Sequence, residues 1–311
     1  MSERFAPDGF VLVDKPPEWT SFDAVRWVRK AFPGGKVGHA GTLDPFATGL
    51  LVLLVGKATR LMRYLEGYRK EYEGEMLLGV ATDTCDPTGT VTRETPPEQV
   101  AALTQERIQE EFKLWTGEVE QVPPAFSAVR IQGERAYKKA RRGEETELES
   151  RDVEIFQLEL TSWEPPRAIF RSSVGTGTYL RSLARDVGEG LGVGGHLTRL
   201  RRTAIGPFRV EGAYPLQGDE RSGHIRDRLR PMVELLPAGL RVEITAAQAR
   251  RVMNGNELRV PAESVRYAEE SSFVGVVSRQ ELVAVGRLIV VGADGIFQPR
   301  TVLTLPRFLE G

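Results

Sequence analysis

The chain has 311 residues, of which 42 are lysine or arginine and 43 are aspartate or glutamate, so the formal net charge is −1. Hydrophobic residues make up 41% of the chain and charged residues 27%, which is the composition of a globular protein. This composition excludes a disordered chain, a collagen-like chain and a small protein that depends on disulfides. The length predicts one large domain and one smaller domain.

Cysteines, histidines and apolar runs narrow the class further. Cys85 is the only cysteine, which excludes an intrachain disulfide and a cysteine-ligated metal cluster, and the three histidines are too scattered to predict a zinc site. The longest apolar run, 50–55, is far shorter than the roughly 20 residues that span a bilayer. The N-terminus shows no apolar signal segment. We therefore expect a cytoplasmic protein that does not enter the membrane.

The first part of the chain alternates short apolar runs with turn residues. We expect a strand at 10–13, ended by a pair of prolines, and then an amphipathic helix at 22–32 with Thr20 or Ser21 as its N-cap. The pattern then predicts a loop at 38–49, a buried strand at 50–55, a helix at 57–65, a strand at 72–80, a turn at 83–89, a helix at 98–115 and a proline-broken extended segment at 119–131.

The second part of the chain mixes strands and helices without regular alternation. This order favours an α+β fold over a doubly wound parallel sheet. Residues 211–239 are rich in glycine, proline and charge and are predicted to be a linker, so we place the two domains at 1–235 and 240–311. The smaller domain has the pattern of a compact β-barrel-like module. The predicted elements are strands at 153–163 and 168–174, a helix at 179–191, a helix at 244–253, and strands at 257–260, 273–277, 282–291 and 301–305.

Basic residues gather in three places despite the near-neutral net charge. Residues 130–142 hold six basic side chains against one acid, residues 57–70 hold five against one, and residues 199–202 hold three. A single charged run is most often a solvated surface, but three such runs favour a polyanion as the partner.

The segment 38–51, Gly-His-Ala-Gly-Thr-Leu-Asp-Pro-Phe-Ala-Thr-Gly-Leu-Leu, is the most unusual part of the sequence. Its glycines, threonines and proline surround one aspartate, Asp44, directly before a buried strand. From turn chemistry alone, Asp44 would accept hydrogen bonds from the backbone in an Asx turn. A nucleotide site is not indicated, because Leu51 stands where a phosphate-binding loop over residues 56–59 requires an earlier glycine.

The same segment closely resembles the aspartate motif of the TruB family of tRNA pseudouridine synthases. Four further segments resemble other motifs of this family, in the same order along the chain. The resemblance implies the pseudouridine synthase fold, with a mixed, largely antiparallel sheet flanked by helices, and a small C-terminal β-rich domain that resembles a PUA-like RNA-binding module. The four segments are 12–16 with Thr20 and Ser21, 70–72, 177–186 and 196–202.

The resemblance implies an enzyme that isomerises uridine to pseudouridine in the T-loop of tRNA, without a metal or another cofactor. Asp44 matches the catalytic aspartate of the family. It can act by covalent attack or by taking a proton from the ribose during elimination, and the sequence leaves both routes open. Arg181 matches the arginine that pairs with this aspartate. Its guanidinium is expected to keep the carboxylate ionised and to lower the pKa of Asp44.

Four other residues match positions of the family's base pocket and its surroundings. Tyr72 matches the tyrosine that stacks on the target base. Tyr179 and Leu200 match residues that line the pocket, and His39 matches a histidine that contacts RNA. Without the motifs, Tyr72 and Leu200 would be interpreted as core residues. The target uridine has to leave its folded loop to reach such a pocket.

The basic clusters are expected to contact the RNA. The family carries an insertion at about 128–150 that folds over RNA, and the first basic cluster lies within it. The expected RNA contacts are Arg130, Lys138, Lys139, Arg141, Arg142, Arg199, Arg201 and Arg202.

A binding protein without catalysis is the main alternative. The basic clusters would also serve a protein that binds tRNA or assists its folding, but binding alone has no need of a buried carboxylate paired with Arg181. A glycosidase fits less well, because no pair of catalytic carboxylates is evident. We expect the T-stem-loop of tRNA as the partner, no small-molecule cofactor, and a monomeric protein.

Overall fold

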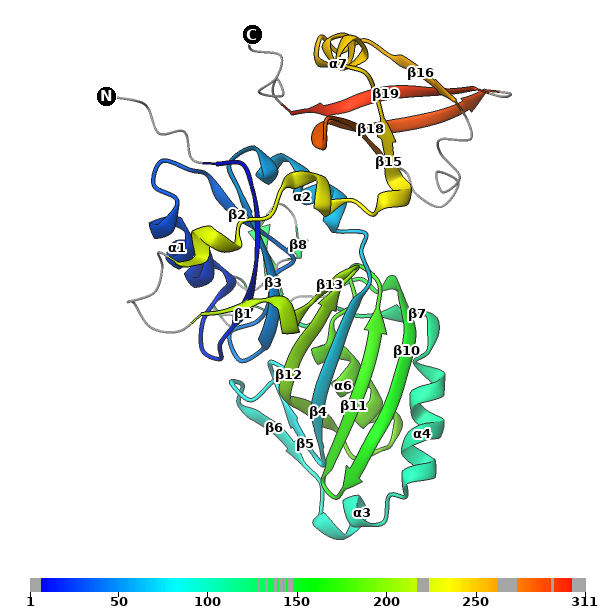
Figure 1. The fold of residues 1–311 in the computed structure, drawn as a ribbon. Helices are drawn as coiled ribbons and strands as arrows, with labels where there is room; N and C mark the ends of the chain where they lie inside the picture. Colours follow the sequence, from blue (N-terminus) through cyan, green and yellow to red (C-terminus); the bar gives the residue numbers. More distant parts are fainter. Residues whose placement is uncertain are drawn as a thin grey trace.

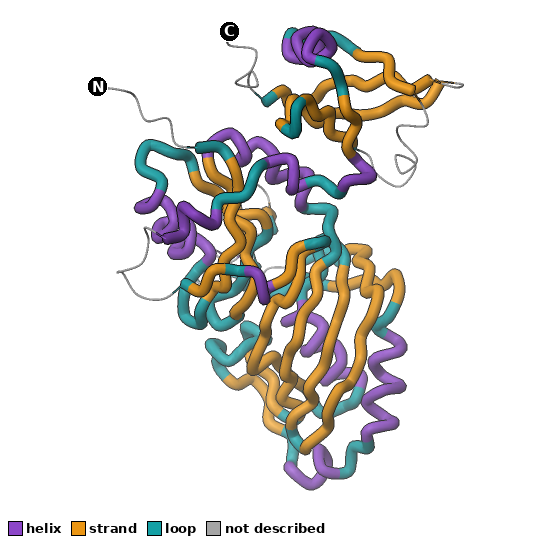
Figure 2. Tube along the Cα trace, viewed as in Figure 1, coloured by secondary structure: helices purple, strands orange, loops and turns teal. Residues whose placement is uncertain are grey.

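The computed structural model describes residues 7–127, 129–131, 134–136, 139, 142, 144, 148–216, 224–261, 273–291 and 294–303. These residues form a ten-stranded sheet, a five-stranded sheet and two two-stranded ribbons, with helices packed on both larger sheets (Figures 1 and 2). The expected α+β class is confirmed, with a mixed sheet in the larger part of the molecule and a β-rich C-terminal part.

The larger sheet contains β1 (Gly9–Lys15), β2 (Val37–Ala40), β3 (Thr48–Val55), β4 (Lys70–Leu78), β7 (Gly117–Gln121), β10 (Arg151–Glu164), β11 (Arg167–Val174), β12 (Gly195–Ile205), β13 (Phe208–Arg209) and β14 (Tyr214–Pro215). Its order is β14-β1-β3-β12-β4-β11-β10-β7, with β2 paired to β3 and β13 paired to β12. β14 with β1 and β12 with β3 pair in parallel, and the other described pairs are antiparallel. β12 therefore joins the N-terminal strands to the middle of the chain.

The N-terminal part of this sheet is buried on both faces. β3 is buried along nearly its whole length, as its continuous apolar run predicts. On one face of the sheet packs α1 (Ser21–Ala31), whose N-cap Thr20 forms a capping box. On the other face pack the short helices η1 (Gly56–Leu61) and α2 (Met62–Leu65).

The rest of the larger sheet is covered on one face only. The helices α4 (Gln105–Leu114) and α6 (Leu180–Gly190) pack their apolar side chains against β4, β10, β11 and β12. There the rings of Phe112 and Phe170 meet edge to face, with their centroids 6.5 Å apart. The opposite face of β11 carries exposed charged side chains such as Arg171. Apolar and polar residues thus alternate along these strands, as in a half-buried antiparallel sheet.

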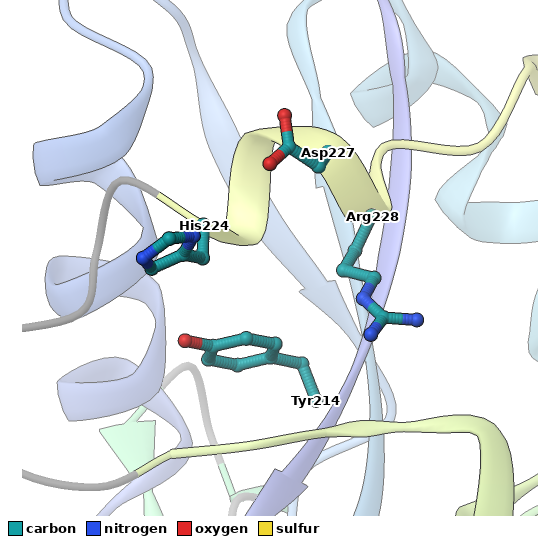
Figure 3. Close-up of a pocket in the computed structure, with 4 residues that line it drawn as sticks. All are labelled: Tyr214, His224, Asp227 and Arg228. Atoms are coloured by element: carbon teal, nitrogen blue, oxygen red, sulfur yellow. The ribbon is translucent and has the colours of Figure 1, made fainter.

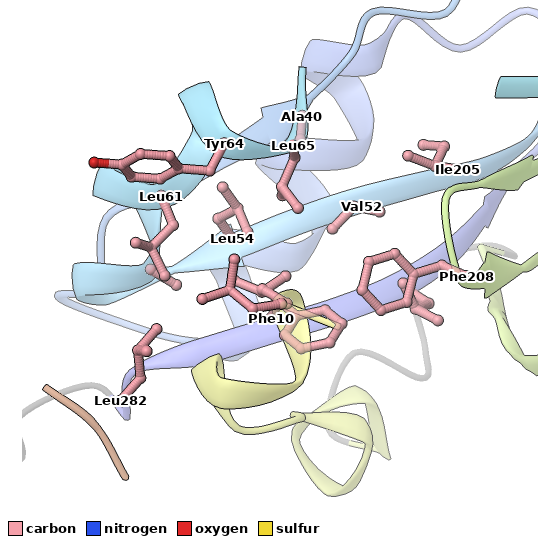
Figure 4. Packing of buried hydrophobic residues seen from close by; sticks show 14 of the residues in the cluster. Phe10, Ala40, Val52, Leu54, Leu61, Tyr64, Leu65, Ile205, Phe208 and Leu282 are labelled. Atoms are coloured by element: carbon pink, nitrogen blue, oxygen red, sulfur yellow. The ribbon is translucent and has the colours of Figure 1, made fainter. Parts of the chain in front are cut away.

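The C-terminal sheet packs against the N-terminal part of the larger one. A single hydrophobic cluster contains Leu282 of the C-terminal sheet together with Phe10 and Leu54 (Figure 4). Across the same contact, Tyr64 Oη and Thr301 Oγ1 lie 2.7 Å apart, and both residues are buried. The C-terminal sheet has the order β15-β17-β18-β19-β16 and is accompanied by α7; the bounds are β15 (Arg241–Glu243), α7 (Ala246–Met253), β16 (Leu258–Pro261), β17 (Val274–Ser278), β18 (Glu281–Val291) and β19 (Asp294–Val302).

Three predicted elements differ from the observed ones. The predicted loop 38–49 begins in a strand, β2, because the backbone at 37–40 pairs with β3 although glycines interrupt its apolar pattern, and the last two residues of the predicted loop already belong to β3. The predicted helix 98–115 is two helices, α3 (Pro97–Ala101) and α4, and the second begins after its own N-cap, Thr104. The strand predicted at 301–305 begins at Asp294, and residues 304–305 lie outside the described residues.

The predicted linker 211–239 is wrong as a description of the described residues there. β14 pairs with β1, and Leu216, Ile225, Leu235 and Leu236 are buried. The sequence pattern hides this packing, because short 3-10 helices lack the periodicity of an α-helix. These helices are η2 (Val210–Gly212), η3 (His224–Arg228), η4 (Met232–Leu235) and η5 (Ala238–Leu240).

The two-stranded ribbons lie elsewhere in the chain. One pairs β5 (Val80–Thr82) with β6 (Val91–Glu94), and the other pairs β8 (Arg130–Ile131) with β9 (Glu134–Arg135).

Candidate active site

Asp44 lies in the turn between β2 and β3, and the start of α1 holds this turn in place. Ser21 Oγ accepts a hydrogen bond from the Leu43 N–H at 2.8 Å and donates one to the Leu43 carbonyl at 3.1 Å. Both bonds are buried. The residue before Asp44 is thus fixed by a side chain 22 positions earlier in the chain.

A buried lysine holds the other side of the turn. Lys15, at the end of β1, has no exposed surface. Its ammonium donates to the carbonyls of Pro16 at 2.8 Å, Trp19 at 2.7 Å and Pro45 at 3.2 Å, which uses all three of its protons. Burial lowers the pKa of Lys15 to about 8, and the nearby charge of Asp44 opposes this shift. The bond to Pro45 ties the residue after Asp44 to β1.

Arg181, in the first turn of α6, meets Asp44 from the opposite side. Its Nε lies 2.9 Å from Asp44 Oδ2 and its NH2 group 3.3 Å from Asp44 Oδ1, so the two groups face each other as a fork. The other donors reach the Thr84 carbonyl at 3.0 Å, the Phe126 carbonyl at 2.9 Å and Asp86 Oδ2 at 3.3 Å. All five N–H donors of the guanidinium are therefore used within the protein. The predicted ion pair is present, and Arg181 has no donor left for a phosphate.

Asp86 is a member of this cluster that the sequence analysis missed. It lies in the turn predicted at 83–89, is buried, and its Oδ1 accepts hydrogen bonds from Thr84 Oγ1 at 2.7 Å and from the Thr88 N–H at 3.0 Å. An aspartate before a proline and a threonine looks like an ordinary turn residue. Its second role arises only from Arg181, which lies 95 positions further along the chain.

Asp44 sits in a recess where opposing influences act on its pKa. Its side chain is 35% exposed and the Arg181 side chain only 6% exposed. Burial raises the pKa of Asp44, the Arg181 guanidinium opposes this, and the negative charge of Asp86 adds to the rise. The lowering effect expected from Arg181 is present, but burial outweighs it, so the pKa of Asp44 is raised overall. The guanidinium thus limits a rise that burial causes.

The predicted pocket residues lie on elements that meet at this turn. Tyr72 of β4 packs against the hydrophobic cluster that contains Leu43, Leu180 and Leu200, the neighbours of Asp44 and Arg181 along the chain or across the sheet. Leu200 is buried. Tyr179 is the N-cap residue of α6, two positions before Arg181. The structure thus brings the predicted pocket side chains to the vicinity of Asp44.

Burial shifts the pKa values of two pocket residues, Tyr179 and His39, in the direction that favours the neutral form. Burial raises the pKa of Tyr179 above its ordinary value. His39 lies on β2, five positions before Asp44, and burial together with the positive charge of Arg202 lowers the pKa of His39. Near neutral pH the imidazole of His39 therefore offers one donor and one acceptor rather than two donors.

Comparison with known families identifies the protein class. The model described as TruB family pseudouridylate synthase (N terminal domain) matches residues 29–180, and the model described as tRNA pseudouridylate synthase B C-terminal domain matches residues 181–236. The tRNA pseudouridine synthase B of Thermobifida fusca (strain YX) is 43% identical over 260 residues, which cover 81% of this chain and 86% of that protein. The chain belongs to the TruB family of pseudouridylate synthases. The resemblance inferred from the motifs is confirmed.

The similarity extends to the C-terminal part of the synthase. The tRNA pseudouridine synthase B of Solibacter usitatus (strain Ellin6076) is 39% identical over 303 residues, covering 95% of this chain and 100% of that protein. Among solved structures, one described as a crystal structure of a Cbf5-Nop10-Gar1 complex has a chain that is 28% identical, with a TM-score of 0.71 over 96% of this chain and 86% of that chain. Both sheets of the fold are therefore shared with known relatives.

Among the described residues, several buried polar atoms around the candidate active site have no hydrogen-bond partner. They include His39 Nδ1, Gln121 Nε2, Ser172 Oγ and Thr178 Oγ1. The carbonyl oxygen of the Gln121 side chain accepts the Tyr179 N–H at 2.8 Å, so the orientation of this amide is fixed and its NH2 group is the part left over. Buried polar groups normally have a partner. Donors and acceptors of this kind suit a site that a polar ligand completes.

The third basic cluster does not act as one surface. Arg202 is 1% exposed and donates to the carbonyls of Gly41, Thr42 and Leu50, so it supports the Asp44 turn from inside and the predicted RNA contact at this residue is wrong. Gly49 fits this close approach, because its φ is +103° and a Cβ there would lie 2.3 Å from the Arg202 carbonyl oxygen.

The other two arginines of the third basic cluster, Arg199 and Arg201, lie at the surface. Arg201 pairs with Asp14 through two bonds, at 3.0 and 2.6 Å. Arg199 is exposed. Of this cluster, Arg199 is therefore the side chain that the structure leaves best placed for an RNA phosphate.

The first basic cluster is described only in part. Arg142 bonds to Glu134 at 2.8 Å and to Glu144 at 2.7 Å, so its charge is already matched by two carboxylates. Lys139 is half-buried. Lys138 and Arg141 lie outside the described residues, and of Arg130 only the backbone, in β8, is described.

A cavity of about 490 Å³ opens on the far side of β1 from β3, beside β14 (Figure 3). It is lined by Tyr214, His224, Asp227 and Arg228, and Trp27 of α1 lies next to Tyr214 with the ring centroids 6.1 Å apart. It shares no lining residue with the cluster around Asp44. In the described part of the chain, no helix is long and apolar enough to cross a membrane, and no group of three or more histidine, cysteine and acidic side chains is arranged to hold a metal ion.

Proposed function

We propose that this synthase converts uridine to pseudouridine in the T-loop of tRNA and that Asp44 is its catalytic residue. The observation that carries the proposal is the fork between Arg181 and Asp44, with Nε to Oδ2 at 2.9 Å, inside a protein of the TruB family. A partly exposed carboxylate held in one orientation by a saturated guanidinium is placed to react rather than to stabilise the fold.

The isomerisation breaks the N1–C1′ bond of uridine, turns the uracil over and joins C5 to C1′. In the covalent route, Asp44 attacks C1′, uracil leaves as an anion, and C5 then displaces the carboxylate. In the elimination route, Asp44 takes the C2′ proton as uracil leaves, and it returns this proton when C5 adds to C1′. In both routes the proton on C5 is lost at the end and N1 is protonated. Both routes begin with an ionised Asp44.

The surrounding residues are proposed to hold the flipped nucleotide. Tyr72 would stack on the uracil, Tyr179 and Leu200 would line the pocket, and His39 would contact the RNA near the flipped nucleotide. Their common packing around the Asp44 turn supports these roles. An extruded base is held by such a combination of stacking and polar contacts.

The remaining assignments concern the whole chain. We propose residues 1–235 as the catalytic domain and residues 240–311 as a PUA-like RNA-binding domain, acting on tRNA as a cytoplasmic monomer. The separate sheet formed by β15 to β19 supports this division. Arg130, Lys138, Lys139, Arg141 and Arg199 remain the proposed RNA contacts of the basic clusters, and Arg142 and Arg201 would have to exchange carboxylate partners for phosphate.

Tritium release from tRNA labelled with [5-³H]uridine tests the catalytic assignment. Asp44→Asn keeps the size of the side chain but can act neither as nucleophile nor as base, so turnover is expected to vanish while tRNA binding stays within a few-fold. Asp152→Asn, at an exposed position of β10, is the matched control and should leave turnover unchanged. Appreciable pseudouridine formation by Asp44→Asn would show that the assignment is wrong.

A further inference from the structure

A second cavity lies where α2 meets the C-terminal sheet. It has a volume of about 450 Å³ and is lined by Arg63, Phe273, Arg287 and Arg300. The three arginines are exposed, and none of them pairs with a carboxylate among the residues that the structure describes. We propose that this cavity binds a backbone phosphate of the substrate RNA, remote from the reacting uridine. This inference rests on the proposed function.

The strand geometry brings two of these arginines together. Along β18 and β19, Val285 pairs with Thr301 and Gly286 pairs with Pro299, which leaves Arg300 as an extra residue on β19. A bulge of this kind turns the side chain of the extra residue away from the regular alternation. Gly286 permits the close approach of the strands here, since a Cβ on it would lie 2.0 Å from the Gln298 carbonyl oxygen. Arg287 follows directly on β18.

The third arginine comes from the catalytic domain and is held by the domain contact. Tyr64, next to Arg63, bonds to Thr301 at 2.7 Å and meets the Phe273 ring edge to face with the centroids 4.7 Å apart. One turn earlier, Arg60 donates to the Val302 carbonyl at 2.6 Å. These contacts fix α2 against β19. The three guanidinium groups therefore surround one space before any ligand arrives, which reduces the entropy lost on binding an anion.

The chemistry of the lining favours a nucleotide of an RNA chain. The guanidinium group of arginine binds phosphate oxygens through paired N–H donors. The ammonium group of lysine is more strongly hydrated and lacks this paired geometry. Phe273 supplies an apolar aromatic wall against which a ribose or base can pack. An acidic peptide would satisfy the charges but would make no use of this ring.

The position of the cavity shows which part of the RNA it would meet. Asp44 precedes β3, and Arg63 follows it after η1, so the two lie beyond opposite ends of this strand. β3 has eight residues, and at about 3.3 Å per residue it spans roughly 25 Å. The phosphate of the reacting uridine cannot reach the cavity from the active site. The cavity would thus hold another segment of the same tRNA.

The test compares full-length tRNA with an isolated T-arm hairpin as substrates of the full chain. We expect the combined variant Arg63→Ala, Arg287→Ala and Arg300→Ala to raise KM for tRNA about tenfold or more without changing kcat, and to lower the salt slope of tRNA binding by about one, because one phosphate contact is lost. The hairpin should show little change in KM. The triple variant Arg250→Ala, Arg251→Ala and Arg259→Ala, at exposed positions of α7 and β16 in the same sheet region, is the charge-matched control and should affect neither RNA.

Each outcome decides the proposal. An unchanged KM and salt slope for tRNA in the triple variant overturns the site and leaves the cavity to another kind of partner. An equal loss on the hairpin overturns the placement far from the active site, and an equal loss in the charge-matched control variant overturns the site by showing a general charge effect. If the intact protein forms no pseudouridine but the triple variant still loses its salt slope, the proposed function fails while the phosphate site stands. A melting temperature equal to that of the intact protein confirms that the variant is folded.

Discussion

All the N–H donors of the Arg181 guanidinium are hydrogen-bonded, so the other acceptors around Arg181 influence the orientation and the pKa of Asp44. Its guanidinium lies between two carboxylates, Asp44 and Asp86, and its remaining donors go to backbone carbonyls. Because Asp86 is buried and tied into its own turn, it cannot move away when the substrate enters. The charge on Asp86 therefore acts on the Asp44 carboxylate through a fixed geometry.

This arrangement predicts the pH dependence of the reaction. Since the pKa of Asp44 is raised and the proposed reaction begins with ionised Asp44, kcat/KM should fall with decreasing pH at a higher pH than for an ordinary carboxyl group. Asp86 contributes to that rise. Asp86→Asn should therefore shift the acid limb of the pH profile to lower pH, while kcat at neutral pH falls because Arg181 loses one of its anchors.

Asp83→Asn is the control for this pH profile. Asp83 lies in the same turn, and its carboxylate accepts the Thr90 N–H at 2.8 Å without contacting Arg181. An acid limb that stays in place in Asp86→Asn, or that moves equally in both variants, would contradict the role assigned to Asp86.

At the scale of elements, the turn between β2 and β3 depends on the N-terminus of α1. Ser21→Ala removes both bonds to Leu43 and leaves a buried N–H and a buried carbonyl without a partner. We expect a loss of about 2 kcal/mol in the free energy of unfolding, measured in urea, and a lower kcat because Asp44 is no longer held in place. Ser150→Ala, at an exposed position, should change neither quantity. Full stability of Ser21→Ala would show that water or another group replaces the hydroxyl.

The basic segment 128–150 provides a second prediction at this scale. If it folds over the RNA, replacing Lys138, Lys139 and Arg141 by alanine should lower the salt slope of tRNA binding by up to about three. Arg142→Ala should lower the slope by less than one, because Glu134 and Glu144 already match its charge. A salt dependence that is the same in all variants would show that the segment is only a solvated surface.

The sequence predicted those elements that can be recognised from their own residues, without knowing which other strands or helices they contact. The apolar run of β3, the capping residue Thr20 and the spacing of α6 are all visible in the sequence. β2 and β14 were missed because each is a short strand defined by its neighbour in the sheet rather than by its own side chains.

In the candidate site too, residues within the motifs were predicted, whereas those that act through contacts distant in the sequence were not. The motifs predicted Asp44 and Arg181 and their pairing. They did not predict that Lys15, Ser21 and Asp86 would hold this pair, since each of these residues has an ordinary local interpretation as a strand end, a helix cap or a turn. Nor could the burial of Arg202 be read from a cluster of three basic residues.

At the scale of the whole molecule, the C-terminal sheet completes a hydrophobic core and is proposed to extend the RNA surface. A chain that ends at residue 235 should retain kcat on a T-arm hairpin and show a raised KM for full-length tRNA, because contacts remote from the uridine contribute uniformly to ground and transition states. Its melting temperature should also fall, since Val277, Leu282 and Val285 no longer cover the hydrophobic cluster around Phe10.

A cooperative melt first shows that the shortened chain is folded. Steady-state kinetics on both RNAs then test this prediction. A folded chain with a normal KM for tRNA but a collapsed kcat would place part of the catalytic machinery in the C-terminal residues.

The hydrophobic cluster shared by the two sheets also determines how the protein comes apart. Side chains from β1, β3, β17 and β18 bury one another, and the Tyr64–Thr301 bond is sealed inside the same contact. Neither sheet can lose its order without exposing apolar surface of the other, so heat or denaturant should unfold both in one transition rather than in two. The calorimetric and van't Hoff enthalpies would then agree for the full chain, as in a single-domain protein. Two units of architecture thus behave as one unit of unfolding.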